Sequence, residues 1–172
     1  GLSQNSRNGV ETDLKYYFNL RSDLDATFGL RHLTRRGQLF EAEVRSLGPN
    51  HEGQFNGAFL PEDRINDLNP VAPSQNQNPF DRNITSLFYD FKLAGLTTQI
   101  NFSKASDLNF LRDFDSELAP YSTHLAGLRP ANPQYGRILP ALNQRISVQY
   151  ERTHFKADLS YQGFQMLVPQ LN

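Results

Sequence analysis

The stretch Glu11–Leu20 reads ETDLKYYFNL, and its side chains alternate in character. Its even positions carry Thr12, Leu14, Tyr16, Phe18 and Leu20, and its odd positions carry Glu11, Asp13, Lys15, Tyr17 and Asn19. Successive side chains of a strand point to opposite faces, so this pattern predicts a strand with one oily face and one charged face. Strands of soluble domains are usually about 5–6 residues long, whereas a transmembrane strand needs roughly 9–11. The length therefore favours a strand that crosses a membrane.

The same alternation recurs along the chain and predicts eight antiparallel strands joined up and down. They span residues 10–20, 24–33, 38–47, 53–60, 82–93, 96–104, 143–152 and 155–166. Residues 1–9 are polar and are predicted to be a connector, and 61–81 and 105–142 are predicted to be long loops. No helical period competes with this pattern, so we expect residues 1–172 to form a single all-β segment.

Composition excludes several classes of protein. The 172 residues carry a net charge of −1, without the basic excess that a nucleic-acid-binding protein usually has. The absence of cysteine excludes a disulfide scaffold and a thiolate metal site. The four histidines lack the spacing of metal ligands. We therefore predict no metal, no cofactor and no nucleic-acid partner.

The predicted oily face carries essentially no charge when all eight strands are taken together. On a lipid-facing surface, one Arg or Lys at mid-membrane would cost roughly 2–4 kcal/mol, so lipid contact requires this pattern. A soluble β-sandwich also keeps charge out of its core. The pattern thus favours a transmembrane β-barrel without excluding a soluble fold.

Six segments together resemble the start of the barrel domain of the LptD family, the LPS-assembly proteins of the Gram-negative outer membrane. They are RNGVE (Arg7–Glu11), YYFNL (Tyr16–Leu20), DAT (Asp25–Thr27), RRG (Arg35–Gly37), LPEDR (Leu60–Arg64) and SKASDLNFLRDF (Ser103–Phe114). Their order and spacing make the combination specific. The resemblance implies an incomplete barrel segment of about eight strands in the cell outer membrane, since family members have a periplasmic domain before this region and many more strands after it.

The resemblance also implies a function in passage rather than chemistry, so we expect no enzyme activity and no catalytic residue. The implied function is lipopolysaccharide transport and insertion into the outer leaflet of the outer membrane. The implied partners are lipopolysaccharide, membrane lipids, an LptE-like lipoprotein plug and a periplasmic LPS-bridge protein. The family's lateral exit for lipid lies beside the first barrel strand, where the candidate gate residues are Leu14, Lys15, Tyr16, Tyr17, Phe18 and Asn19.

Relatives often carry proline in the first two barrel strands, at the positions that Lys15 and Leu30 occupy here. Proline has no N–H to donate to a strand ladder. We therefore expect the first strand to pair more strongly with the second in this chain than in those relatives.

Charged residues of the polar face are candidates for contact with the lipopolysaccharide head group or for pairing across strands in a wet lumen. The lumen-facing candidates are Lys15, Arg31, Glu41, Glu43 and Arg45. In the second long loop we expect Asp107, Phe110, Arg112, Asp113 and Phe114 to tuck the chain into the barrel. Arg35 and Arg36 could bind phosphate, but as turn residues they are predicted to be solvated anchors.

Two other folds fit the alternation. One is a self-contained eight-stranded barrel that acts as a small membrane anchor or adhesin, and the other is a soluble lipocalin-like barrel that binds apolar ligands. A closed barrel pairs its first strand with its last, whereas a segment leaves both edges open. The side of the membrane that the long loops face stays open, because short turns usually lie in the periplasm while the resemblance places the long loops there.

Overall fold

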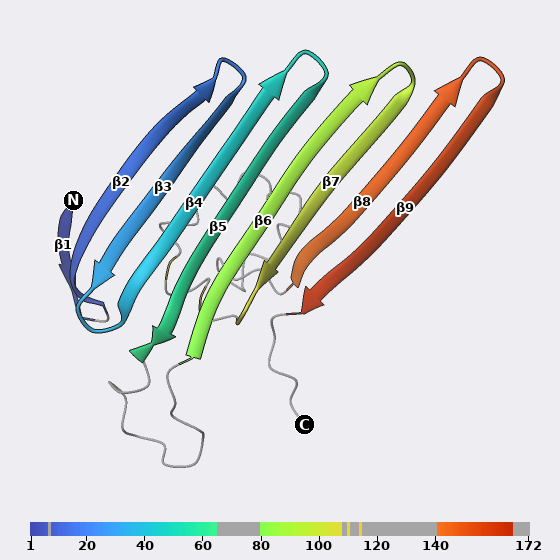
Figure 1. The fold of residues 1–172 in the computed structure, drawn as a ribbon. Coiled ribbons are helices and arrows are strands. Elements are labelled where there is room, and N and C mark those ends of the chain that lie inside the picture. Colours follow the sequence, from blue (N-terminus) through green and yellow to red (C-terminus); the bar gives the residue numbers. More distant parts are fainter. Residues whose placement is uncertain (7, 65–79, 108–109, 111–113, 115–140, 167–172) are drawn as a thin grey trace, which may run out of the picture.

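Nine strands form the protein in a computed structural model that describes residues 1–6, 8–64, 80–107, 110, 114 and 141–166. The strands are β1 (Leu2–Asn5), β2 (Gly9–Arg21), β3 (Leu24–Leu33), β4 (Gly37–Gly48), β5 (His51–Asp63), β6 (Phe80–Leu93), β7 (Leu96–Ala105), β8 (Ala141–Arg152) and β9 (Phe155–Met166). Each strand pairs antiparallel with the next in sequence, so the sheet order is β1 to β9 without a crossover. Figure 1 shows one curved sheet. The turns that join β2 to β3, β4 to β5, β6 to β7 and β8 to β9 lie at one end and are called the tight turns, whereas the turn between β3 and β4 lies at the other end.

The predicted strands are confirmed, and the structure adds one more. β3 and β9 have the predicted bounds, and the others extend by one to three residues at one or both ends. The expectation of a connector over residues 1–9 is wrong, because Leu2–Asn5 pairs with Gly9–Thr12. This segment lacks an oily alternation of its own, and its extended form follows from the hydrogen-bonding edge that β2 offers.

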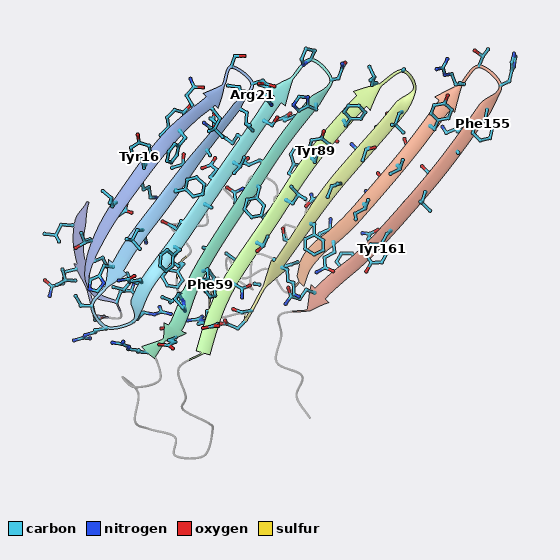
Figure 2. All side chains as sticks on the ribbon, viewed as in Figure 1. Tyr16, Arg21, Phe59, Tyr89, Phe155 and Tyr161 are labelled. Atoms are coloured by element: carbon cyan, nitrogen blue, oxygen red, sulfur yellow. The ribbon has the colours of Figure 1, made fainter. Side chains whose placement is uncertain are left out.

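The oily face of the sheet is uncovered in the described structure. Cross-strand register places Tyr16 beside Phe28 and Phe28 beside Ala42, and the alternation extends this face to β9. Its exposed large side chains are Leu14, Tyr16, Phe18, Leu20, Phe28, Leu30, Phe40, Phe55, Phe59, Ile146, Phe155, Leu159 and Tyr161. Figure 2 shows several of these side chains spread across the whole sheet. A surface this large and apolar requires a nonaqueous neighbour.

The predicted lack of charge on the oily face has exceptions at strand ends: one is Arg152, the last residue of β8, which pairs in register with Phe155, and another is Lys104. It pairs in register with Thr85, which lies on that face, and it is exposed. Lys104 is the last residue but one of β7. A long side chain at a strand end can reach the aqueous boundary, so this position differs from mid-membrane.

The buried core lies on the opposite, charged face, which we call the inner face. It consists of Leu33, Leu39, Ala58, Leu60, Ile84, Ala105, Phe110, Phe114 and Leu142. Leu39 pairs in register with Arg31, and Ala58 pairs with Glu41, so apolar and charged residues share this face. The core sits at the end of the sheet away from the tight turns. The inner face is therefore apolar as well as charged at this end.

Both outer strands leave an edge open among the described residues. β1 covers only Gly9–Thr12 of β2, and β9 pairs with β8 alone. The sheet is thus not a closed barrel, which contradicts the self-contained eight-stranded alternative. The lipocalin-like alternative also fails, because it requires closure around the oily face. Within the part of the chain that the structure describes, no helix is long and apolar enough to cross a membrane.

Candidate functional site

The outer edge of β2 is the first feature of the candidate site. The backbone of Asp13 exchanges hydrogen bonds with Gly1, at 2.8 and 3.0 Å, so its N–H and C=O point away from β3. Backbone groups alternate in direction along a strand, so those of Lys15, Tyr17 and Asn19 point to the same outer edge. Beyond Asp13, that edge has no strand partner among the described residues. We call this edge, Leu14–Arg21, the seam edge.

The direction of the backbone groups decides whether Lys15 or Leu30, the two positions where relatives often carry proline, affects the β2–β3 ladder. The β2–β3 ladder is continuous from Glu11 to Asn19. The N–H of Lys15 is directed to the seam edge, however, so this residue does not strengthen that ladder. Leu14 and Leu30 are directly paired and their backbone groups face each other. Leu30 is therefore the position where a proline would weaken the β2–β3 ladder.

A pair of proline variants tests this direction. Leu14→Pro removes a donor from the β2–β3 ladder and leaves the backbone carbonyl of Leu30 without its partner in the bilayer, at a cost of about 1–3 kcal/mol. Lys15→Pro removes a donor from the open edge only, so its cost is expected to be far smaller. Denaturant unfolding of the two variants in detergent measures the difference. Equal destabilisation by both variants would show that the seam edge is assigned to the wrong side of β2.

A charged cluster lies on the inner face beside the seam edge. Lys15 Nζ lies 3.8 Å from Glu41 Oε2, and Arg31 lies 3.6 Å from the same oxygen and 4.0 Å from Glu11. The side chain of Lys15 is 51% exposed, whereas that of Arg31 is 6% exposed. The structure thus brings three of the predicted lumen residues together. Of the two cations, only Lys15 is open to a ligand.

The other two predicted lumen residues lie near the tight turns. Arg45 donates to both carboxylate oxygens of Asp25, at 2.9 and 3.0 Å, and lies 3.6 Å from Glu43. This pair is half-exposed and bidentate, with the geometry of a cross-strand contact. It is separate from the cluster beside the seam edge.

A buried ionic network forms at the opposite end of the inner face. Arg36 Nε donates to Asp63 Oδ1 at 3.0 Å, and Arg82 Nη1 donates to Asp63 Oδ2 at 2.7 Å. Arg82 also donates to both oxygens of Asp107, at 2.8 and 3.0 Å. Arg36, Asp63 and Arg82 are almost completely buried. The prediction that Arg36 is a solvated anchor is therefore wrong.

The chain after β7 is fastened to this network. Asp107 Oδ1 accepts a hydrogen bond from the backbone N–H of Phe110 at 2.8 Å, as the cap of a helical turn does. The Phe110 and Phe114 rings lie over the guanidinium groups of Arg82 and Arg36, at 5.4 and 4.7 Å. Both rings are buried in the core. We call Asp107, Phe110 and Phe114 the strap; the predicted strap residues Arg112 and Asp113 lie outside the described residues.

Asp107 is charged at neutral pH. Burial raises the pKa of its carboxyl group, but hydrogen bonds from Arg82 and Ser106 and the charge of Arg82 together lower it by more, so the pKa lies below its ordinary value. A carboxyl group with a lowered pKa in the folded state stabilises that state above the ordinary value, and the stabilisation is lost as the pH falls through the lowered value. The strap therefore stays attached at neutral pH.

Sequence reasoning missed Arg36, Asp63 and Arg82 as a group. Asp63 was placed in a predicted loop, and its two partners lie 27 and 19 residues away. The available signal was the apolar Leu33, which breaks the alternation next to Arg36. Among the described residues, no group of His, Asp and Glu could hold a metal ion.

These features define a class of protein. The oily face is uncovered, the inner face is charged, the strands are 10–14 residues long from β2 onward, and the sheet is open at both edges. Only a lipid-exposed β-sheet turns its apolar side outward while pairing charges inside. The chain is therefore a wall segment of a transmembrane β-barrel of the outer-membrane type.

Comparison with known proteins identifies the barrel. The chain is 37% identical over 120 residues to LPS-assembly protein LptD of Psychrobacter arcticus, covering 66% of this chain and 12% of that protein. It is 29% identical over 185 residues to LptD of Burkholderia cenocepacia, covering 96% of this chain and 23% of the relative. LptD of Nitrosococcus oceani is 29% identical over 167 residues, 97% of this chain and 19% of its own length. No protein-family model matches the chain.

The chain is thus homologous to a segment of LPS-assembly protein LptD, and it spans about a tenth to a quarter of the length of these relatives. The homology confirms the predicted resemblance and, with the open nine-stranded sheet, the predicted barrel segment. LptD proteins are Gram-negative outer-membrane proteins, which confirms the predicted location. They form a transport family, so the prediction that the chain is not an enzyme is also confirmed.

Proposed function

We propose that the chain forms one wall of a lipopolysaccharide translocon and that the seam edge of β2 borders the exit for the acyl chains. The observation that carries this proposal is the contrast between edges. Among the described residues, strands β3 to β8 are paired on both sides, whereas β2 beyond Asp13 is paired on one side only, as β9 is at the other edge of the sheet. An edge that a neighbouring strand can leave is the simplest path from a polar interior into lipid.

The two faces next to this edge suit the two parts of the lipid. Tyr16 and Phe18 on the oily face give acyl chains an apolar surface, and their rings lie 4.4 Å apart. Lys15 on the inner face is half-exposed and offers its ammonium group to an anionic head group. Arg31 supports the cluster but is buried between two carboxylates. Lys15 is therefore the proposed head-group contact.

The partners follow from the same proposal. A lipoprotein plug of the LptE type would occupy the space inside the inner face, and a periplasmic bridge protein would deliver lipopolysaccharide to the start of β2. In this orientation the strap and the ionic network lie at the periplasmic end, and the tight turns lie at the outer surface. The chain would contribute only part of each contact surface.

Photocrosslinking in living cells tests this function. A benzophenone amino acid at Tyr17, on the inner face of β2, is expected to form an adduct with lipopolysaccharide on irradiation. The matched control is Gln149, which lies on the inner face of β8, away from the seam edge. Adducts at Tyr17 that exceed those at Gln149 several-fold support the proposal. An absence of adducts at Tyr17, or equal yields at both positions, would contradict it.

A further inference from the structure

Polar contacts of the inner face form a connected path across the sheet. The path begins in the strap, where Asp107 accepts two hydrogen bonds from Arg82 of β6. Arg82 also donates to Asp63 of β5, and Asp63 in turn accepts from Arg36 in the turn between β3 and β4. Alternating positive and negative side chains therefore link the turn between β3 and β4, the end of β5, the start of β6 and the strap. No member of this half of the path belongs to β2.

The path continues from Arg36 to the start of β2. Arg36 Nη1 donates to Asn8 Oδ1 at 3.2 Å, and Asn8 Nδ2 donates to Glu11 Oε1 at 2.9 Å. Asn8 directly precedes β2 and Glu11 lies within it. Both side chains are buried, at 6% and 8% exposure. Asn8 is the joint, because its amide accepts from one side and donates to the other.

We infer that this path, the ionic chain of Asp107, Arg82, Asp63, Arg36, Asn8 and Glu11, positions the first residues of β2 according to whether the strap is attached. The inference concerns coupling within this segment. It rests on the proposed function only in taking β2 as the strand beside the lipid exit. Release of the strap thus loosens the first residues of β2, which lead into the seam edge. The residues of the chain are positioning residues and contact no transported lipid.

The physical basis is the shared use of acceptors in a buried site. Both guanidinium groups depend on Asp63, and Arg82 depends in addition on Asp107. Loss of the Asp107 charge makes Arg82 interact more strongly with Asp63, because a buried charge is costly without a paired carboxylate. Arg36 then shares Asp63 less favourably and shifts its contact with Asn8. Buried polar networks transmit such changes because their members polarise one another at low dielectric.

The aromatic rings of the strap reinforce the coupling. Phe110 and Phe114 cover the two guanidinium groups from the interior side, and the rings lie 4.9 Å apart. While they are in place, water has little access to Arg36 and Arg82. When the strap leaves, water reaches both groups and weakens every ion pair of the chain. We therefore expect the start of β2 to be ordered while the strap is attached and to become less ordered when the strap is released.

Hydrogen exchange of the native protein in detergent tests the coupling. Asp107→Asn keeps the size of the side chain and removes its charge. Amides of Glu11–Leu14 are expected to exchange about five-fold faster or more in this variant, whereas amides of β8 should not change. Asp25→Asn is the matched control: it also removes a carboxylate bound to an arginine, lies on β3 beside β2, and is outside the ionic chain. Acceleration limited to the strap, or equal acceleration by the control, would overturn the inference.

A second variant tests the joint itself without touching the buried charges. Asn8→Ala should accelerate exchange at Glu11–Leu14 on its own, and Asp107→Asn added to it should then have no further effect there. Additive effects would contradict transmission through Asn8. No lipopolysaccharide is present in this experiment, so its failure would leave the proposed translocon function standing. Conversely, failure to crosslink lipopolysaccharide at Tyr17 would leave the exchange result unaffected.

Discussion

Asp63→Ala is expected to destabilise the folded sheet by about 3–5 kcal/mol, because breaking a buried ion pair leaves an uncompensated buried charge. Both Arg36 and Arg82 donate to the carboxylate of Asp63, and all three side chains are almost fully buried. Its loss places two positive guanidinium groups next to each other in the core without that carboxylate. Denaturant unfolding of the variant and the native protein in detergent measures the effect.

Two matched variants make this prediction specific. Asp25→Ala removes a carboxylate that binds Arg45 with similar geometry but at a half-exposed site. Exposed pairs contribute about 0.2–1 kcal/mol, so its effect should be several-fold smaller. Asp63→Asn keeps one acceptor oxygen and should fall between the two. If Asp63→Ala and Asp25→Ala cost the same, the network at the end of the inner face would not stabilise the fold.

Phe28→Arg is expected to cost about 2–4 kcal/mol, the penalty for a cation at mid-membrane on the lipid face of a barrel. Phe28 lies in the middle of β3 and half of its side chain is exposed on the oily face. In water an exposed Phe→Arg change would be nearly neutral, so the cost arises from lipid alone. Folding titrations in phospholipid vesicles measure it.

The control for this change is its neighbour on the other face. Thr27 pairs in register with Tyr17 and Glu43 on the inner face. Thr27→Arg should be tolerated, since the new cation meets water and can pair with Glu43. The same substitution thus has opposite consequences at adjacent residues. If Phe28→Arg were as well tolerated in vesicles as Thr27→Arg, the oily face would not be facing lipid.

The strands could be predicted from the sequence because alternation of oily and polar residues is a local property. Glu11–Leu20 and the seven similar segments each carry the pattern, and the structure extends them by only a few residues. β1 could not be predicted in this way, because it is held by the edge of β2 and not by a pattern of its own. The strap rings Phe110 and Phe114 were predicted as packing residues, and both are buried.

The ionic network could not be predicted because it depends on register across four strands. Arg36 lies in the turn between β3 and β4, where arginine is usually solvated, and nothing local distinguishes it from Arg35. Its burial follows from Leu33 and Leu39, which put apolar side chains on the inner face around it. The direction of the backbone N–H and C=O groups of Lys15 could not be predicted from the sequence either. It depends on which neighbouring strand each residue of β2 bonds to. The structure supplied it through the contact between Asp13 and Gly1.

Spin-label accessibility along β2 tests the central claim most directly: the oily face meets lipid and the charged face meets a polar interior. Labels placed singly at positions 14 to 19 of the native protein in lipid vesicles are compared for collision with oxygen, which concentrates in lipid, and with a water-soluble nickel complex. We expect Leu14, Tyr16 and Phe18 to favour oxygen and Lys15, Tyr17 and Asn19 to favour the nickel complex, with a period of two. Uniform accessibility, or an alternation of the opposite phase, would contradict the account.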